Sequence, residues 1–263
     1  MKIGFLGAGN MGGAIAKAVC AAGYAADVIL CDKDESKTAA LAAELGCESG
    51  AIASLTACDT VFLGVKPQYL REATAQLCTV LANRRPLLIS MAAGVSLETL
   101  CALAPGYPII RIMPNTPVGI GKGMVLYTPG NGVTKDQTDR FLDIMKRAGV
   151  LTLLPEDKID AASAVSGCGP AFVALFIEAL ADGAVAAGLP RGTAITLASQ
   201  TLLGTAALVM ESGKHPGTLK DEVCSPGGST IAGVQALENG AFRATVIDAV
   251  LAAFERTKEL GKQ

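Results

Sequence analysis

The chain of 263 residues has no tryptophan, one histidine and only 4% aromatic residues. Charge is also scarce, because Asp, Glu, Lys and Arg make up 17% of the sequence and the formal net charge is -2. A near-neutral chain without basic clusters gives no electrostatic reason to bind nucleic acid or an anionic membrane surface. With one histidine and no C-x-x-C pattern, we predict no metal site.

The eight cysteines are scattered, and we interpret them as buried, reduced thiols in a cytoplasmic protein. We expect neither a secretory signal nor a membrane association. Asn10 and Lys17 interrupt the apolar N-terminus, and Glu178 and Asp182 interrupt the most apolar later stretch, 171–189.

Small and apolar residues are abundant instead. Hydrophobic residues make up 51% of the chain, and 30 glycines add to them. This share exceeds what soluble domains usually contain. The composition predicts a large core and further apolar surface that is buried against a second copy of the chain.

Apolar runs of strand length alternate with helical patterns through residues 1–154. We expect strands at 2–6, 28–31, 60–65, 87–91, 109–113, 124–127 and 150–154, and helices at 13–22, 35–45, 68–81, 97–103 and 134–148. Helices of this length between strands indicate an α/β domain with a parallel sheet covered on both faces.

Residues 155–263 show helical patterns only, at 157–165, 170–187, 191–212, 216–223, 230–238 and 241–260. Glycine after one helix and proline at the start of the next separate them. The helices at 170–187 and 191–210 are apolar on nearly every side, so they must be buried all round. We therefore predict an all-α dimerisation domain, in which these helices pack against a second copy of the chain.

The pattern Gly7-x-Gly9-x-x-Gly12 directly follows the first expected strand and opens a helix. Glycines permit a tight turn and close approach to a pyrophosphate, and the helix N-terminus supplies free N–H groups. Asp32 ends the second strand, where a carboxylate meets the adenosine ribose. The combination favours a dinucleotide site in a Rossmann-like domain over a purely structural turn.

The residues after the second strand leave the choice of cofactor open. Asp32 favours NAD, because a carboxylate accepts from the ribose 2′-OH and repels a 2′-phosphate. The adjacent Lys33 could pair with that phosphate. NADH and NADPH both remain candidates.

Three further loops follow expected strands, at the sheet edge where ligands bind in open α/β sheets. They are 64–67, 92–94 and 113–117, and each is equally compatible with an ordinary turn. Asn115 is a candidate hydrogen-bonding residue. Lys66 is as often a solvated loop residue as a functional one.

In the helical half, the segment 225–230 precedes a helix and contains two glycines and two hydroxyl residues next to them. Such a helix N-terminus suits the capture of a small carboxylate, and a plain helix cap is the alternative. The doubled glycine favours the functional interpretation. The lone His215 lies in a loop, and we expect it to be solvated.

Five segments carry a resemblance to a known family: 3–12 (IGFLGAGNMG), 65–67 (VKP), 113–117 (MPNTP), 166–170 (SGCGP) and 221–230 (DEVCSPGGST). Over essentially its whole length the sequence resembles pyrroline-5-carboxylate reductases. The resemblance implies NAD(P)H-dependent reduction of 1-pyrroline-5-carboxylate to L-proline, the last step of proline biosynthesis. It also implies a Rossmann domain at 1–154, a helical domain at 155–263, and homodimers with a decamer as the further assembly.

The resemblance also assigns roles by position. Thr230 would be catalytic, with its hydroxyl reaching the ring nitrogen. The substrate carboxylate would be held by Ser225, Gly227, Gly228, Ser229 and Thr230. The cofactor would be bound by Leu6, Gly7, Gly9, Asn10, Met11, Gly12, Asp32, Lys33, Val65, Lys66, Pro67, Ala92, Ala93 and Asn115.

Two departures from the family pattern bear on the cofactor. Relatives often have an Asn-Arg-Ser-like loop where this chain has Asp32-Lys33-Asp34, and an Asn near position 51 where this chain has Ala51. The resemblance favours NADPH, and the loop weakens that preference.

Two other classes of protein share the N-terminal glycine turn. A β-hydroxyacid dehydrogenase shares the N-terminal pattern but needs a lysine base after a Gly-x-Gly segment, where this chain has Val173. A nucleotide-sensing protein without activity would keep the glycine turn at 7–12 but would have no reason to keep segment 225–230.

Overall fold

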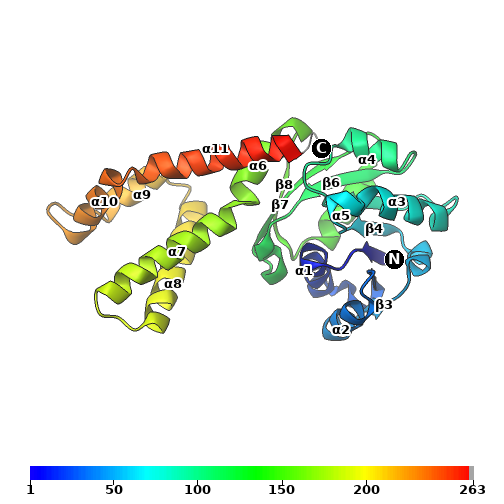
Figure 1. Cartoon of the computed structure of the whole chain (residues 1–263), viewed down its shortest axis with the longest axis horizontal. Coiled ribbons are helices and arrows are strands. Elements are labelled where there is room, and N and C mark those ends of the chain that lie inside the picture. Colours follow the sequence, from blue (N-terminus) through cyan, green and yellow to red (C-terminus); the bar gives the residue numbers. More distant parts are fainter. Residues whose placement is uncertain (261–263) are drawn as a thin grey trace. The chain divides into compact units, whose positions relative to one another are not determined.

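The computed structural model describes residues 1–260, which divide into two compact units (Figure 1). The first contains Met1–Cys168 and the stretch from Ala253 onward, and the second is Gly169–Ala252. Helix α6 (Glu156–Ser166) belongs to the first unit, so compactness does not divide the chain at 154/155. The domain boundary given by the sequence stays a prediction.

An eight-stranded sheet forms the centre of the first unit, in the order β3-β2-β1-β4-β5-β6-β7-β8. All neighbours pair in parallel except β6 and β7. The strands are β1 (Ile3–Leu6), β2 (Val28–Cys31), β3 (Glu48–Ser49), β4 (Thr60–Leu63), β5 (Leu87–Ser90), β6 (Ile109–Met113), β7 (Gly123–Pro129) and β8 (Gly149–Leu153). The α/β fold is confirmed.

Helices cover both faces of this sheet, as predicted. Phe5 and Ile89 contribute to the core under α1 and α5, whereas Leu63 and Leu88 contribute to the core under α3 and α4. The Phe5 and Phe62 rings stack with centroids 4.6 Å apart. The helices are α1 (Asn10–Val19), α2 (Glu35–Leu45), α3 (Pro67–Leu81), α4 (Leu97–Leu103) and α5 (Lys135–Ile144).

The predicted parallel sheet has one exception, β7, which runs antiparallel to β6. Only residues 114–122 connect the two strands, and they form the short 3-10 helix η4 (Thr116–Ile120). A parallel neighbour needs a crossover of a dozen or more residues, so a connection of this length reverses the chain. The two-residue β3 and the 3-10 helix η3 (Ile52–Ala57) were also missed, because neither has a periodic apolar pattern.

Between β6 and α6 lies a partly buried ion-pair network. The Arg111 guanidinium is buried and contacts Glu156 Oε1 at 3.0 Å and Asp160 Oδ1 at 2.9 Å. Glu156 Oε1 also accepts from the Leu97 N–H at the start of α4, at 2.6 Å. These charge-assisted bonds fasten α6 to the sheet and to α4.

The second unit is entirely helical, which confirms the predicted class. It holds α7 (Gly169–Ala186), α8 (Arg191–Ser212), α9 (Pro216–Glu222), α10 (Ser229–Asn239) and most of α11 (Phe242–Leu260). Helices α7 and α8 form a hairpin whose turn includes Gly188 at φ +101°.

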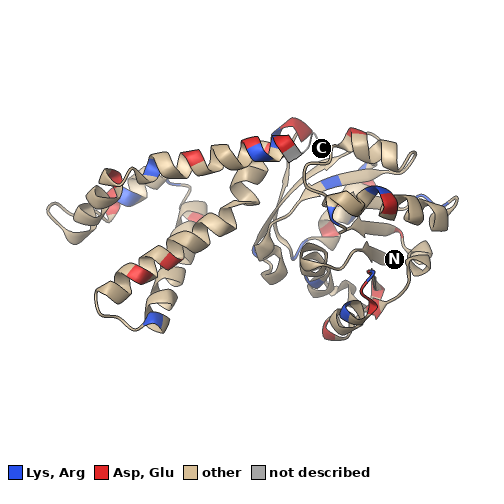
Figure 2. Ribbon diagram, in the orientation of Figure 1, with Lys and Arg blue, Asp and Glu red and all other residues tan. Residues whose placement is uncertain are grey.

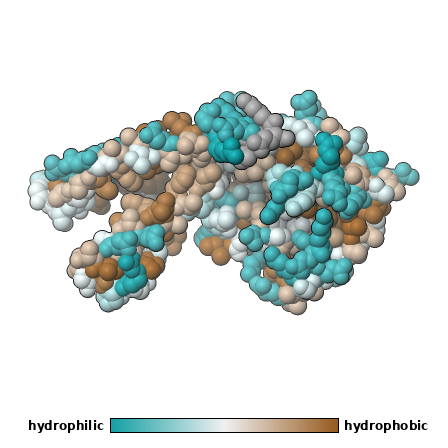
Figure 3. All heavy atoms as spheres, in the orientation of Figure 1, coloured by the Kyte–Doolittle hydropathy of each residue, from teal (hydrophilic) through white to brown (hydrophobic). Residues whose placement is uncertain are grey.

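Within one copy of the chain, α7 and α8 leave much apolar surface uncovered. Leu175 is 66% exposed, Leu203 59% and Met210 70%. Figure 2 shows few charged residues on this hairpin, and Figure 3 shows apolar atoms at its surface. Exposed apolar surface of this extent marks an interaction site.

By length and composition alone, two helical stretches, Glu156–Ala186 and Arg191–Ser212, are apolar enough to cross a membrane. A helix buried inside a protein passes the same test, so the finding by itself does not place the chain in a membrane.

Candidate functional site

The glycine turn after β1 is built from backbone contacts too close for any side chain. Gly7 has φ +98°, and a Cβ there would lie 2.6 Å from the Gly64 carbonyl carbon. A Cβ on Gly12 would lie 2.1 Å from the Gly7 carbonyl oxygen. The turn, the first turn of α1 and the end of β4 therefore touch through backbone atoms.

Gly9 differs from its neighbours, because a Cβ at this position would meet nothing within 4 Å. Gly9 is also the residue before α1, and no side chain caps that helix N-terminus. Open space above free N–H groups is the arrangement that receives a phosphate. The structure thus has room for a pyrophosphate at the predicted place.

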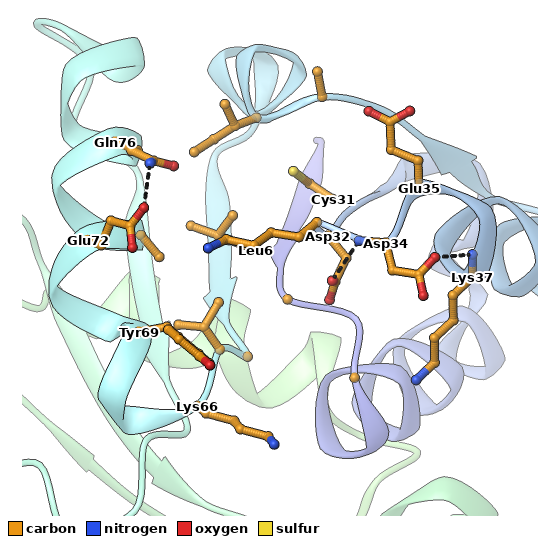
Figure 4. A pocket seen from close by; sticks show the side chains of 18 of the residues that line it. Leu6, Cys31, Asp32, Asp34, Glu35, Lys37, Lys66, Tyr69, Glu72 and Gln76 are labelled. Carbon is orange, nitrogen blue, oxygen red and sulfur yellow. Dashed lines mark hydrogen bonds between the residues drawn. The ribbon is translucent and has the colours of Figure 1, made fainter.

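A cleft of about 480 Å³ adjoins this turn, between the β2–α2 loop and α3 (Figure 4). Of the residues expected to bind cofactor, seven line it: Leu6, Gly7, Gly9, Asp32, Lys33, Val65 and Lys66. The remaining seven do not: Asn10, Met11, Gly12, Pro67, Ala92, Ala93 and Asn115. The cofactor-binding roles of all fourteen residues remain predictions.

Asp32 is tied to backbone groups on two sides. Its Oδ2 accepts from the Ala8 N–H at 2.7 Å, and its Oδ1 accepts from the Asp34 N–H at 3.2 Å (Figure 4). Asp34 in turn caps α2, and the Lys37 N–H holds the pKa of its carboxyl below the usual value. Both carboxylates therefore shape the loop.

Lys33 reaches across the cleft, with its Nζ 5.3 Å from the centroid of the Tyr69 ring. Tyr69, in the first turn of α3, is half exposed and lines the cleft. Our sequence reasoning missed this residue. The available signal was an aromatic side chain two residues after the 65–67 loop in a chain with few aromatics.

Asn115 is buried and holds two elements with its side-chain amide. Its Oδ1 accepts from the Met124 N–H and its Nδ2 donates to the Ser166 carbonyl oxygen, both at 2.8 Å. Ala92 is also buried, and Ala93 is exposed beside it.

The expected substrate residues lie in the second unit. Gly227 has φ +67°, and a Cβ on Gly228 would lie 2.4 Å from Ser225 Oγ. The backbone conformation at Gly227 and the close approach of Ser225 to Gly228 therefore also favour glycine at these two positions, apart from any role in binding. No side chain caps α10 after Gly228, and Ser229 and Thr230 in its first turn are exposed. Free N–H groups beside two hydroxyls suit a small carboxylate.

His215 is exposed, and its Nδ1 accepts from the Gly217 N–H at 3.1 Å, so it caps α9. Across residues 1–260, no three His, Cys, Asp or Glu side chains are grouped so that they could hold a metal ion.

An α/β unit with a glycine turn, an uncapped helix N-terminus and an adjoining cleft at the strand ends is a dinucleotide-binding domain of the class found in NAD(P)-dependent oxidoreductases. Residues 2–94 match a family model described as NADP oxidoreductase coenzyme F420-dependent, and residues 156–260 match one described as pyrroline-5-carboxylate reductase dimerisation.

Known proteins match nearly the whole chain. Pyrroline-5-carboxylate reductases of Arabidopsis thaliana and Escherichia coli are each 41% identical, over 99% of this chain and 96% and 98% of their own lengths. A crystal structure of Plasmodium falciparum pyrroline carboxylate reductase with NADP bound superposes with a TM-score of 0.89 and 32% identity, over 99% of this chain and 98% of that one. The chain belongs to the pyrroline-5-carboxylate reductase family.

Proposed function

We propose that this chain reduces the cyclic imine 1-pyrroline-5-carboxylate to L-proline with NAD(P)H, the last step of proline biosynthesis. One observation carries the proposal: the same chain holds an open phosphate-binding turn at Gly9 and a second uncapped helix N-terminus at Gly228. The first suits a dinucleotide, and the second suits the carboxylate of a small substrate.

Bound NAD(P)H supplies a hydride from its nicotinamide. The chain's own task is to hold both molecules in register. The N–H groups at the start of α1 bind the pyrophosphate, and the cleft beside Val65 and Lys66 receives the adenosine half. The loops at 92–94 and 113–117 lie at the ends of β5 and β6, where we place the nicotinamide.

The substrate needs little acid or base catalysis. Protonated at nitrogen, the imine is already an electrophilic iminium, and hydride addition to its carbon leaves a neutral amine that keeps that proton. The first-turn N–H groups of α10 and the Ser225 and Ser229 hydroxyls hold the carboxylate. The Thr230 hydroxyl accepts from the ring N–H and fixes the C=N bond.

The chain self-associates through its helical half, and we propose homodimers paired through the apolar surfaces of α7 and α8. We further propose that dimers assemble into a decamer, and that the enzyme is soluble in the cytoplasm without membrane association. The exposed leucines of the hairpin support this pairing, because contact with a second copy would remove their apolar surface from water.

Thr230 variants test the mechanism. We expect Thr230→Ala to lower kcat/KM by about ten- to a thousandfold, as for loss of a positioned polar contact. Thr230→Ser keeps the hydroxyl and should retain most of the activity. NADPH binding should be the same in both variants, and wild-type turnover in Thr230→Ala would remove this residue from the mechanism.

A further inference from the structure

We propose that Asp32 is a positioning residue of the glycine turn, and that Lys33 rather than Asp32 determines the choice between NADPH and NADH. The inference rests on the proposed function only in taking the cleft as the site of the adenosine half. It reverses the usual interpretation of an acidic residue at the end of the second strand, which is selection of NADH.

The turn is fastened to the end of β2 by two successive N–H groups. The Gly7 N–H donates to the Cys31 carbonyl oxygen at 2.8 Å, and the Ala8 N–H donates to Asp32 Oδ2 at 2.7 Å. Ala8 is buried, and its N–H makes this hydrogen bond at the partly buried edge of the turn. A buried donor needs a partner, and a carboxylate is a strong one. Asp32 thus fixes the turn that presents Gly9.

The same contacts weaken Asp32 as a cofactor selector. Its other oxygen, Oδ1, accepts from the Asp34 N–H at 3.2 Å (Figure 4). Two backbone dipoles therefore point at the carboxylate and offset part of its charge. A carboxylate held in this way repels a 2′-phosphate less than a free one.

Lys33 has the opposite character. It is exposed at the cleft wall, and within residues 1–260 its ammonium makes no ion pair, its Nζ lying 5.3 Å from the centroid of the Tyr69 ring. Cation–π contacts at exposed sites are weak. An incoming 2′-phosphate can therefore recruit this ammonium without breaking an ion pair, while the ring keeps it at the cleft.

The other charges facing the cleft do not favour either cofactor strongly. Asp34 and Glu35 on one wall and Glu72 on the other are acidic, and Lys37 and Lys66 are basic. Asp34 is used in capping α2, and Glu72 accepts from Gln76 Nε2 at 3.2 Å. Because these charges nearly balance, the unpaired ammonium of Lys33 determines the preference for NADPH over NADH.

Equilibrium binding of NADPH and of NADH, followed by nicotinamide fluorescence, tests the proposal without any imine. Asp32→Ala should weaken both cofactors by a similar factor of about ten or more, because it removes the acceptor of a buried N–H. Asp32→Asn keeps an acceptor oxygen and should recover most of the binding, with the NADPH to NADH ratio unchanged.

Lys33→Ala should raise the Kd for NADPH by about ten- to a hundredfold and that for NADH by less than about threefold. Lys135→Ala, an exposed lysine on α5 outside the cleft, is the matched control and should change neither Kd. If a thermal melt shows that the Asp32→Ala variant is not folded, the Asp32→Asn and Lys33→Ala variants still test the proposal.

The proposal is wrong if Asp32→Asn shifts the ratio toward NADPH by tenfold or more, or if Lys33→Ala weakens both cofactors equally. Failure of the proposed function looks different: the binding pattern would hold while no variant, nor the wild type, converts the imine.

Discussion

Asn115 and Ser166 join the loop after β6 to the last residue of α6: the Asn115 Nδ2 donates to the Ser166 carbonyl oxygen at 2.8 Å. The same side chain accepts from the Met124 N–H at the start of β7. Since both polar atoms of the amide are engaged and the residue is buried, its first task is to hold these segments together.

Replacing Asn115 by Asp should therefore lower stability without any cofactor present. The substitution keeps an acceptor for Met124 but places a carboxylate oxygen against the Ser166 carbonyl, which costs about 1–3 kcal/mol. Urea unfolding of the cofactor-free chain measures it. Asn83→Asp, at an exposed position after α3, is the control and should change stability by less than about 0.5 kcal/mol. Equal stability of the two variants would contradict the structural role.

Substitutions in the glycine turn should separate folding from binding. Gly9→Ala has room for its Cβ in the chain and should shift stability by no more than about 1 kcal/mol. It should still weaken NADPH binding at least tenfold, because the methyl group would occupy the phosphate space. Thermal melting and fluorescence titration give the two readouts.

Gly12→Ala should instead destabilise the fold by about 3 kcal/mol or more, because its Cβ would collide with backbone 2.1 Å away. Gly13→Ala, one residue on, meets the end of the flexible Leu41 side chain at 3.2 Å and the Ala8 carbonyl oxygen at 3.4 Å, and it should be mild. A Gly12→Ala variant as stable as Gly13→Ala would refute the close contact of turn and helix.

Charge on the α7–α8 hairpin should prevent subunit pairing. Leu203→Glu places a carboxylate within the exposed apolar surface of α8, where burial against a partner would strip its water. Light scattering after size-exclusion chromatography should show a monomer at concentrations where the wild type is associated. Ala75→Glu on the exposed face of α3 is the control. Unchanged mass for Leu203→Glu would exclude this surface from the interface.

Cysteine reactivity should follow burial. Partial burial, with Cys47 beside it, raises the pKa of the Cys20 thiol to about 12, so its reactive thiolate is scarce at pH 8. We expect iodoacetamide to modify the exposed Cys101 at least a hundredfold faster than Cys20 in the native chain. Peptide mass mapping measures both rates, and urea should make them alike. Native labelling of Cys20 as fast as that of Cys101 would contradict its raised pKa.

Local patterns were sufficient to predict the helices, most strands and the glycine turn, because periodicity and Gly or Pro signals are short-range. The antiparallel β7 was not predicted, since its direction depends on the length of one connection. The partners of Asp32, Asn115 and Tyr69 are also long-range: Ala8 and Asp32 are 24 residues apart, and Asn115 and Ser166 are 51 apart. Residue types indicated function at Asp32 and Asn115 but not at Tyr69, and only the fold shows which atoms these side chains contact.

The most direct test of the proposed reaction is turnover of 1-pyrroline-5-carboxylate with NADPH and with NADH, followed by loss of nicotinamide absorbance and by the proline formed. We predict stoichiometric proline formation with at least one cofactor, and a higher kcat/KM with NADPH. Tight cofactor binding without proline formation from either nucleotide would contradict the reductase assignment.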